Sequence, residues 1–469
     1  MLPLRASGEC LLEGICVAWI IALVQFRLFF LIVFSVIFFG CQELAFAADQ
    51  YDADTQYYEI PASETTTGYP EPYVVVRPVP LPPTPVPLLI IFHSYGGSHE
   101  SFLTETDFVN TAVRQRGWMI LSMLGGHPFH RGGLMSQIHT DLVLEHMQAS
   151  DGDSIDFSRI YGVGFSVGGG AVLNYAARHL NFSGWRFAAL VSASANLSIA
   201  HSYYEEPHSQ LEYVHPLVMG GNPSEVPFHY QQYSVLEATN PSISESFSLD
   251  PETYPSIESD LSLAHNLSNI PLFLLHENSS SIPGLYHLYA QTFGLYSFLL
   301  PFGKANYEER SDINNHSWWV IDSEVACEFL ENHSFEMPLG GRYLIDRTMK
   351  LFSFDVERGS EERFSAFTFY RYPTVNELQL LEVRNIQSLR VELDSLDLTA
   401  TLPLSLLFLF QDETINEVRI FGYSAAPQEV LLNGTIANGL WEWVEDENAI
   451  LLSPQLGFQK WTIHPGGTL

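Results

Sequence analysis

The chain has 469 residues, of which 54 are acidic and 21 are lysine or arginine, and its net charge is −33. Such a surface repels nucleic acid and anionic membranes, so we expect neither as a partner. The length is sufficient for two domains, and we expect one large and one small domain.

The first 47 residues predict an export signal. Residues 15–39 are almost wholly apolar, and Ala45-Phe46-Ala47 is a small-x-small site of the kind that a signal peptidase cleaves. An uncleaved membrane anchor is the alternative, because the apolar run approaches the length that spans a bilayer. A third interpretation is a lipid anchor attached at Cys41. We therefore expect a secreted or extracytoplasmic protein, whose mature form keeps only Cys327 and has no internal disulfide.

Residues 48–337 predict a doubly wound, mostly parallel α/β sheet, because apolar strands alternate with helical stretches. After a polar lead at 49–67, we expect strands at 73–77, 88–92, 118–122, 160–165, 186–194, 271–276 and 296–300. We expect helices at 108–116, 141–147, 171–177, 286–293 and 324–331. The strand at 88–92 is apolar at every position, as is typical when helices cover both faces of a sheet. Residues 197–260 lose this regularity, which predicts a lid or a substrate-facing insertion.

From about residue 338 the pattern changes to short segments with period two, separated by turns. Examples are the segments at 349–354, 366–370, 389–393 and 430–434. This pattern predicts a β-sandwich domain over residues 338–469. Within it, Trp441 and Trp443 share one strand face, as a sugar-binding platform or as a core or edge pair.

The pentapeptide Gly164-Phe165-Ser166-Val167-Gly168 stands between an expected strand and an expected helix. This G-x-S-x-G spacing places Ser166 on a strained corner, where its hydroxyl stands clear of the backbone and can attack a carbonyl carbon. The alternative is a glycine-rich turn that happens to contain a serine. Serine catalysis also needs a base, an acid that holds the base, and donors for the oxyanion.

The candidate base is His316, which follows the last expected strand and so falls at the carboxyl edge of the sheet. The stretch 93–97 follows a buried strand, and the backbone N–H of Tyr95 is expected to face the oxyanion together with that of Val167. We expect His93 to brace this loop. His127 and His130 lie in a glycine-rich loop, either as cleft residues or as ordinary loop residues.

The order of these elements resembles the α/β-hydrolase superfamily over residues 70–335. The stretch 156–161, Asp-Phe-Ser-Arg-Ile-Tyr, directly before the pentapeptide is similar to secreted esterases of the polyhydroxybutyrate depolymerase and feruloyl esterase type. It is also similar to the catalytic domain of prolyl oligopeptidases. The resemblance implies Ser166 as nucleophile, His316 as general base, and Tyr95 and Val167 as oxyanion donors.

The sequence departs from that family where the acid is expected. The family pattern His-Gly-x-x-Asp-x-x-x-Pro is replaced by residues 276–283, His-Glu-Asn-Ser-Ser-Ser-Ile-Pro, which puts Ser279 where the aspartate belongs. Glu277 is the only carboxylate of this loop and is our candidate acid. The alternatives are that Asn278 or Ser279 holds the histidine, or that a carboxylate such as Asp312 arrives from elsewhere. A smaller departure is Ser94, where the family has a glycine.

Three functions follow from these observations. The first is a secreted serine esterase that forms an acyl-enzyme on Ser166, with an ester, polymer or polysaccharide-linked substrate. The second is a catalytically degenerate binding or surface protein, whose binding face would use the aromatic residues of the insertion: Tyr203, Tyr204, Tyr213, Tyr230 and Tyr233. The third is a peptidase of the prolyl oligopeptidase type, although the chain lacks room for the N-terminal propeller. We expect no metal and no cofactor, because neither ligand spacing nor a phosphate-binding loop is present.

Overall fold

The computed structural model describes residues 50–181, 184–205, 219–223, 225–236, 262–278, 285–361, 363–410 and 415–466. The expected export signal lies outside these residues, as does most of the expected insertion at 197–260. Within the described part of the chain, no helix combines the length and the apolar character needed to cross a bilayer.

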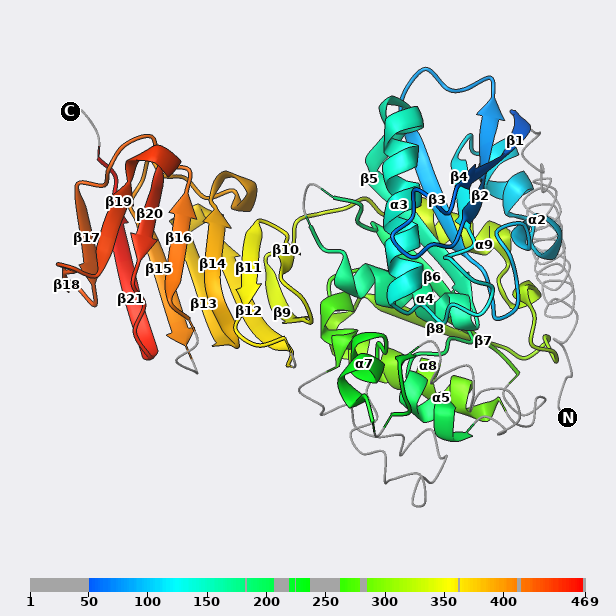
Figure 1. Cartoon of the computed structure of the whole chain (residues 1–469). Coiled ribbons are helices and arrows are strands. Elements are labelled where there is room, and N and C mark those ends of the chain that lie inside the picture. Colours follow the sequence, from blue (N-terminus) through cyan, green and yellow to red (C-terminus); the bar gives the residue numbers. More distant parts are fainter. Residues whose placement is uncertain are drawn as a thin grey trace, which may run out of the picture. The chain divides into compact units, whose positions relative to one another are not determined.

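An eight-stranded sheet forms the centre of the first part of the chain, in the order β1-β2-β4-β3-β5-β6-β7-β8 (Figure 1). Its strands are β1 (Asp52–Ile60), β2 (Glu71–Val79), β3 (Val86–Phe92), β4 (Met119–Met123), β5 (Ile155–Phe165), β6 (Ala189–Ala193), β7 (Leu272–Glu277) and β8 (Ala305–Arg310). Every pairing among β3 to β8 is parallel, and only the pairings of β2 with β1 and with β4 are antiparallel. The prediction of a mostly parallel α/β sheet is confirmed.

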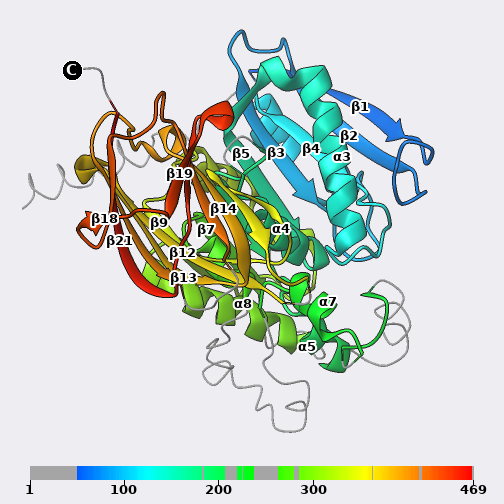
Figure 2. The same ribbon diagram turned by 60° about the vertical axis from the view of Figure 1, so that its left-hand side comes forward.

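Helices cover both faces of this sheet, because its strands are apolar on both sides. The helices on one face are α3 (Leu134–Asp151), α4 (Val167–Arg178) and α8 (Tyr286–Leu299), and those on the other are α2 (Phe102–Glu105), the π-helix η1 (Val109–Arg114) and α9 (Ser323–Glu331). In β3, Leu88 and Ile90 pack with the first group, and Leu89 and Ile91 with the second. Figure 2 shows α3 lying across the strands on its side of the sheet. The sheet is therefore doubly wound, as predicted.

Two of the expected elements are wrong. The expected strand at 296–300 is instead the end of α8 and the first residue of the 3-10 helix η5 (Leu300–Phe302). The α8 rings of Tyr289, Phe293 and Tyr296 follow one another at helical spacing. The last strand is β8, whose Tyr307 packs against Phe293 and Tyr296. The expected polar lead also contains a strand, β1. Both β1 and β8 are edge strands with largely polar sequences. They therefore lack the run of apolar residues that predicts a buried strand.

The described parts of the region from 197 to 267 contain the short helices α5 (Ile199–Glu205), α7 (Pro227–Gln232) and the 3-10 helix η4 (Leu263–Leu267). Of the tyrosines expected on a binding face, Tyr230 is buried and packs edge-on against Tyr203. Tyr233 lies under the Arg178 guanidinium, 5.0 Å from carbon to ring centre. Tyr213 and the side chain of Tyr204 lie outside the described residues.

The C-terminal residues form two further sheets. One has six strands: β10 (Met349–Leu351), β11 (Phe354–Arg358), β14 (Ile386–Glu392), β16 (Glu417–Phe421), β20 (Ala449–Leu452) and β19 (Trp441–Val444). The other has seven: β18 (Thr435–Ile436), β17 (Glu429–Leu432), β21 (Gly457–His464), β15 (Leu404–Phe410), β13 (Glu377–Arg384), β12 (Ser365–Tyr372) and β9 (Gly340–Ile345). Phe354 of the first sheet contacts Phe367 and Phe369 of the second, at 4.9 and 5.0 Å between ring centres.

Details of these sheets differ from the sequence expectation. The segment expected as one strand at 349–354 is split between β10 and β11 by Phe352, whose φ of 51° breaks the extended chain. The chain also passes from sheet to sheet, so that β13 pairs with β15, and β14 with β16, in parallel. Trp441 and Trp443 of β19 pack partly buried against the hydrophobic core, which favours the core or edge pair over the sugar-binding platform.

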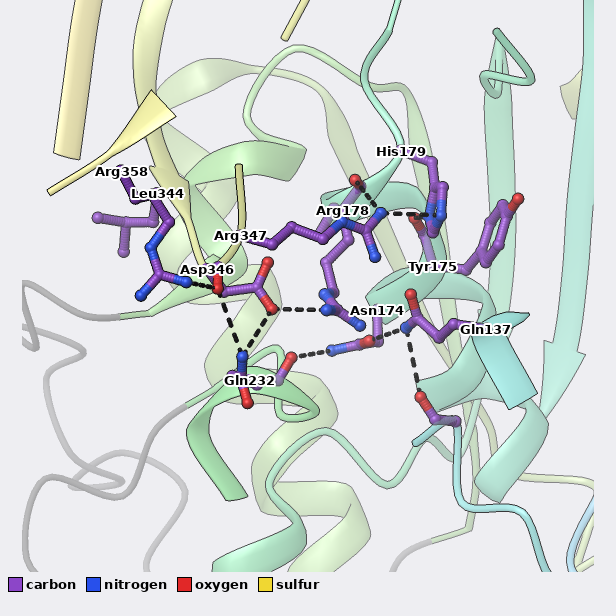
Figure 3. A network of polar contacts seen from close by, with 12 residues as sticks. Gln137, Asn174, Tyr175, Arg178, His179, Gln232, Leu344, Asp346, Arg347 and Arg358 are labelled. Atoms are coloured by element: carbon purple, nitrogen blue, oxygen red, sulfur yellow. Dashed lines mark hydrogen bonds and ion pairs between the residues drawn. The ribbon is translucent and has the colours of Figure 1, made fainter. Parts of the chain in front are cut away.

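A buried polar network joins the end of α4 to the loop after β9 (Figure 3). Arg178 donates from Nη2 to Asp346 Oδ2 at 2.6 Å, and both side chains are buried. Gln232 of α7 and Arg358 of β11 donate to the same aspartate. Leaving one partner of a buried ion pair unpaired costs about 3–5 kcal/mol. The helix that begins at the predicted nucleophile is therefore held at its far end by C-terminal residues.

Candidate active site

Ser166 occupies a strained turn between β5 and α4. Its φ of 57° and ψ of −121° lie in a region that residues other than glycine rarely adopt. The turn is possible because two glycines stand where no side chain fits. An added Cβ at Gly164 would lie 2.1 Å from the Gly168 carbonyl oxygen, and one at Gly168 would lie 2.1 Å from that of Phe92. The G-x-S-x-G pattern thus adopts the sharp strand-to-helix turn that the sequence analysis expected.

His316 lies beside this serine, in the segment between β8 and the 3-10 helix η6 (Trp318–Val320). His316 Nε2 is 2.8 Å from Ser166 Oγ, and His316 Nδ1 is 2.7 Å from Glu277 Oε1. The structure therefore brings the three predicted residues together as a hydroxyl–imidazole–carboxylate relay with hydrogen-bond distances. The Phe165 ring packs against the imidazole at 4.5 Å between centres, and 22% of the His316 side chain stays exposed.

Glu277 is the last residue of β7, not a loop residue as expected, and its side chain is 1% exposed. Its second oxygen, Oε2, accepts a hydrogen bond from the Ser194 hydroxyl. Burial by itself raises the pKa of the Glu277 carboxyl, but the hydrogen bond from His316 and the neighbouring His276 outweigh it, so that the pKa lies below its ordinary value. Glu277 is therefore placed to stay ionised and to hold the imidazole.

The other groups considered for this position make different contacts. Asp312 is exposed and pairs with Arg310 at 3.0 Å, and the Asn278 amide donates to Asn314 at 3.0 Å. Ser279 lies outside the described residues. Ser194, which the sequence analysis missed, follows β6 with a φ of 48° and is 83 residues from Glu277 in the chain. No short-range pattern could have indicated that contact.

The predicted oxyanion donors lie on the two segments that meet at Gly168. Val167 is the first residue of α4, so its N–H has no acceptor within the helix, and the helix N-terminus favours negative charge there. Tyr95 follows β3. Its neighbours Gly96 and Gly97 donate to Pro128 and Ser94 at 2.9 Å each, whereas no backbone carbonyl of the described residues accepts the Tyr95 N–H. Their role as oxyanion donors remains a prediction.

His93 braces the loop that carries Tyr95, as expected. Its Nε2 is 2.8 Å from the Leu124 carbonyl oxygen, and its ring meets His130 edge-on at 4.6 Å. Burial lowers the pKa of both rings, and that of His130 falls well below its ordinary value. His130 is thus a buried packing residue, while the more exposed His127 contacts Phe129. In the described part of the chain, no group of three metal-ligating side chains is placed to hold an ion.

Comparison with known proteins gives likenesses of structure only. No protein-family model and no curated protein matches the sequence. A ferulic acid esterase is similar at 15% identity and a TM-score of 0.41, over 60% of this chain and 99% of that one. An acylaminoacyl peptidase from Pyrococcus horikoshii matches at 14% and 0.42, over 62% and 43% of the two chains. An S-formylglutathione hydrolase from Agrobacterium tumefaciens matches at 13% and 0.41, over 60% and 96%. Every one of these TM-scores is below 0.5.

Proposed function

We propose that the protein is a serine hydrolase of the α/β-hydrolase superfamily that cleaves carboxylic esters through an acyl-enzyme on Ser166. One observation carries this proposal: Ser166, His316 and Glu277 form a continuous relay, and its serine lies on a strained turn at a helix N-terminus. The relay supplies a nucleophile, a base and an acid in the order that acyl transfer requires.

In the first half of the reaction, Ser166 Oγ attacks the ester carbonyl carbon while His316 Nε2 takes its proton. The negative charge that develops on the carbonyl oxygen is stabilised by the N–H groups of Tyr95 and Val167. His316 then gives its proton to the departing alcohol, which leaves an acyl group on Ser166. Glu277 accepts the His316 Nδ1–H throughout, which fixes the tautomer and stabilises the imidazolium.

In the second half, water replaces the alcohol. His316 takes a proton from the water, whose oxygen attacks the acyl carbonyl carbon, and the acid product departs as the proton returns to Ser166 Oγ. The degenerate-protein alternative was motivated by the missing aspartate. The 2.7 Å contact between Glu277 and His316 supplies a carboxylate in its place and so favours the active enzyme.

The finer parts of the proposal rest on the sequence. We propose that residues 1–47 export the protein, on the strength of the apolar run and the Ala45-Phe46-Ala47 site. Resemblance to secreted esterases supports an ester of a polymer or polysaccharide as the substrate. The contacts between the two C-terminal sheets support a β-sandwich over residues 338–469.

The test offers the purified protein short-chain 4-nitrophenyl esters and methyl ferulate. We expect nitrophenolate release with an initial burst if deacylation is the slow step, and loss of turnover in Ser166→Ala. No turnover by the unsubstituted protein, or undiminished turnover in Ser166→Ala, contradicts the proposal. Ser192→Ala is a matched control, because it removes another buried serine hydroxyl near the site. Ser192 belongs to β6, and its hydroxyl donates to the Gly169 carbonyl and not to Glu277.

A further inference from the structure

A second hydroxyl–imidazole–carboxylate relay lies away from Ser166, between the start of β2 and α3. Thr67 Oγ1 is 2.5 Å from His139 Nε2, and His139 Nδ1 is 2.8 Å from Glu71 Oε2. The side chains of His139 and Glu71 are both 0% exposed. Burying a carboxylate costs free energy unless hydrogen bonds and an opposite charge compensate it. The contacts of Glu71 should therefore show what this buried pair does in the fold.

The Glu71 carboxylate holds the first residues of the loop 124–133. Its Oε1 accepts the Gly125 N–H at 2.8 Å, and its Oε2 accepts the Gly126 N–H at 2.6 Å. Both glycines have positive φ, at 67° and 78°, and an added Cβ at Gly126 would lie 2.8 Å from Met135 Cγ. One carboxylate thus satisfies two buried N–H groups in a backbone conformation that only glycine adopts without strain.

The loop 124–133 in turn contacts the segment that carries the predicted oxyanion donor. Hydrogen bonds and ring contacts join them. The Leu124 carbonyl lies 2.8 Å from His93 Nε2, the Pro128 carbonyl accepts the Gly96 N–H at 2.9 Å, and the Phe129 ring packs on Tyr95 at 4.6 Å.

The same loop also touches the nucleophile's helix. An added Cβ at Gly132 would lie 2.9 Å from Ala171 Cα in α4. The loop therefore lies against both segments from which the oxyanion donors come, those of Tyr95 and Val167.

The surroundings of this relay favour positioning over a second reaction centre. Thr67 lacks the positive φ of Ser166 and lies in the connection between β1 and β2 instead of before a helix. The His139 ring is enclosed, and the carboxylate is already occupied by two backbone N–H groups. We propose that Glu71, paired with His139, is a positioning residue that fixes the loop 124–133 and through it the Tyr95 N–H. This inference rests on the proposed function.

The experiment substitutes Glu71→Gln in the full chain, which keeps the side-chain shape but directs an amide N–H at a backbone N–H. We expect kcat for a 4-nitrophenyl ester to fall about 10- to 100-fold with KM nearly unchanged, because one misplaced oxyanion donor acts only in the transition state. Hydrogen exchange of the amides at 93–97 should quicken, while that of β6 stays the same. Thr67→Val is the matched control, because it removes the far end of the relay and leaves the carboxylate's contacts; its kcat should stay near that of the unsubstituted protein.

Three outcomes overturn the proposal. The first is an unchanged kcat per folded molecule with only a lower Tm, and the second is a loss of kcat/KM that comes wholly from a higher KM. The third is an unchanged rate of amide exchange at 93–97. If Glu71→Gln does not fold, His139→Gln is measured in the same way, and an unchanged kcat or exchange rate there overturns the proposal equally. If the unsubstituted protein hydrolyses no ester, the proposed function fails, whereas the exchange measurement still decides whether Glu71 fixes the loop.

Discussion

Among the described residues, two relays each place a hydroxyl beside a histidine Nε2 and a glutamate carboxylate beside its Nδ1, and their surroundings differ. Around Ser166, the imidazole side chain is 22% exposed and the hydroxyl belongs to a residue with φ of 57° at the start of α4. Around Thr67, the imidazole is 0% exposed and the hydroxyl also accepts the Tyr69 N–H at 3.4 Å. A hydroxyl–imidazole–carboxylate contact therefore does not define a reaction centre. A reaction centre also needs an imidazole that the substrate can reach. It further needs N–H groups that are directed at the negative charge developing on the substrate.

The two carboxylates differ in the same sense. Glu277 accepts from one imidazole and one hydroxyl, both of which come from loops at the carboxyl edge of the sheet. Glu71 accepts from one imidazole and two backbone N–H groups, so its hydrogen bonds fix a chain segment. The first arrangement holds an imidazole beside the Ser166 hydroxyl, and the second holds the backbone at Gly125 and Gly126.

The largest expected effect separates the two hydroxyls. Ser166→Ala should lower kcat by up to a million-fold, on the order of what loss of a serine nucleophile costs elsewhere. Thr67→Val should leave ester hydrolysis nearly unchanged, because its relay is enclosed. Steady-state hydrolysis of a 4-nitrophenyl ester measures both. A comparable loss in Thr67→Val would mean that the distinction between the relays is wrong.

The next effect concerns the acid of the first relay. Glu277→Gln keeps the size of the side chain but removes the charge that holds the His316 Nδ1–H, and kcat should fall about 10⁴-fold. Asp312→Asn serves as control, since Asp312 pairs with Arg310 and should not matter for turnover. A larger loss in Asp312→Asn than in Glu277→Gln would show that the acid has been misassigned.

A smaller effect is expected at Ser194, whose hydroxyl donates to the second oxygen of Glu277. Ser194→Ala removes one hydrogen bond to a charged group, so kcat should fall about tenfold. The measurement compares it with Ser192→Ala, two residues earlier on β6. Equal activity in the two variants would mean that Glu277 is held without the help of Ser194.

The smallest effect is on stability and depends on pH. Because the pKa of Glu277 is lowered on folding, its ionised form stabilises the folded state at pH values above the ordinary glutamate pKa. That contribution is lost as the pH falls through the folded-state pKa. Urea unfolding of the unsubstituted protein and of Glu277→Gln should therefore differ more at pH 7 than at pH 3. A difference that does not change with pH would argue against the lowered pKa.

The sequence predicted the parts of the site that depend on local pattern or on chain order. Gly164, Ser166 and Gly168 are a short motif whose turn needs only neighbouring residues, and His316 follows from the order of elements. The acid was harder to predict, because the family pattern puts the acid at the position of Ser279, whereas the carboxylate that contacts His316 is Glu277 at the end of β7. Sequence spacing alone does not distinguish them.

The remaining features depend on contacts between distant residues or on edge strands. Ser194 meets Glu277 across 83 residues, and Glu71 meets Gly125 across 54, so neither contact leaves a local signal. The edge strands β1 and β8 are too polar to be recognised as strands from a hydrophobic pattern. The apolar residues at the end of α8 form a run that is also typical of a buried strand. In each case tertiary packing decides the element.

Reaction with a fluorophosphonate probe, mapped by peptide mass spectrometry, tests the distinction between the relays most directly. We predict one adduct per chain, on Ser166, with a rate that falls sharply in Glu277→Gln and is unchanged in Thr67→Val. An unlabelled Ser166 in folded protein, or an adduct on Thr67, would contradict the assignment of the reaction centre.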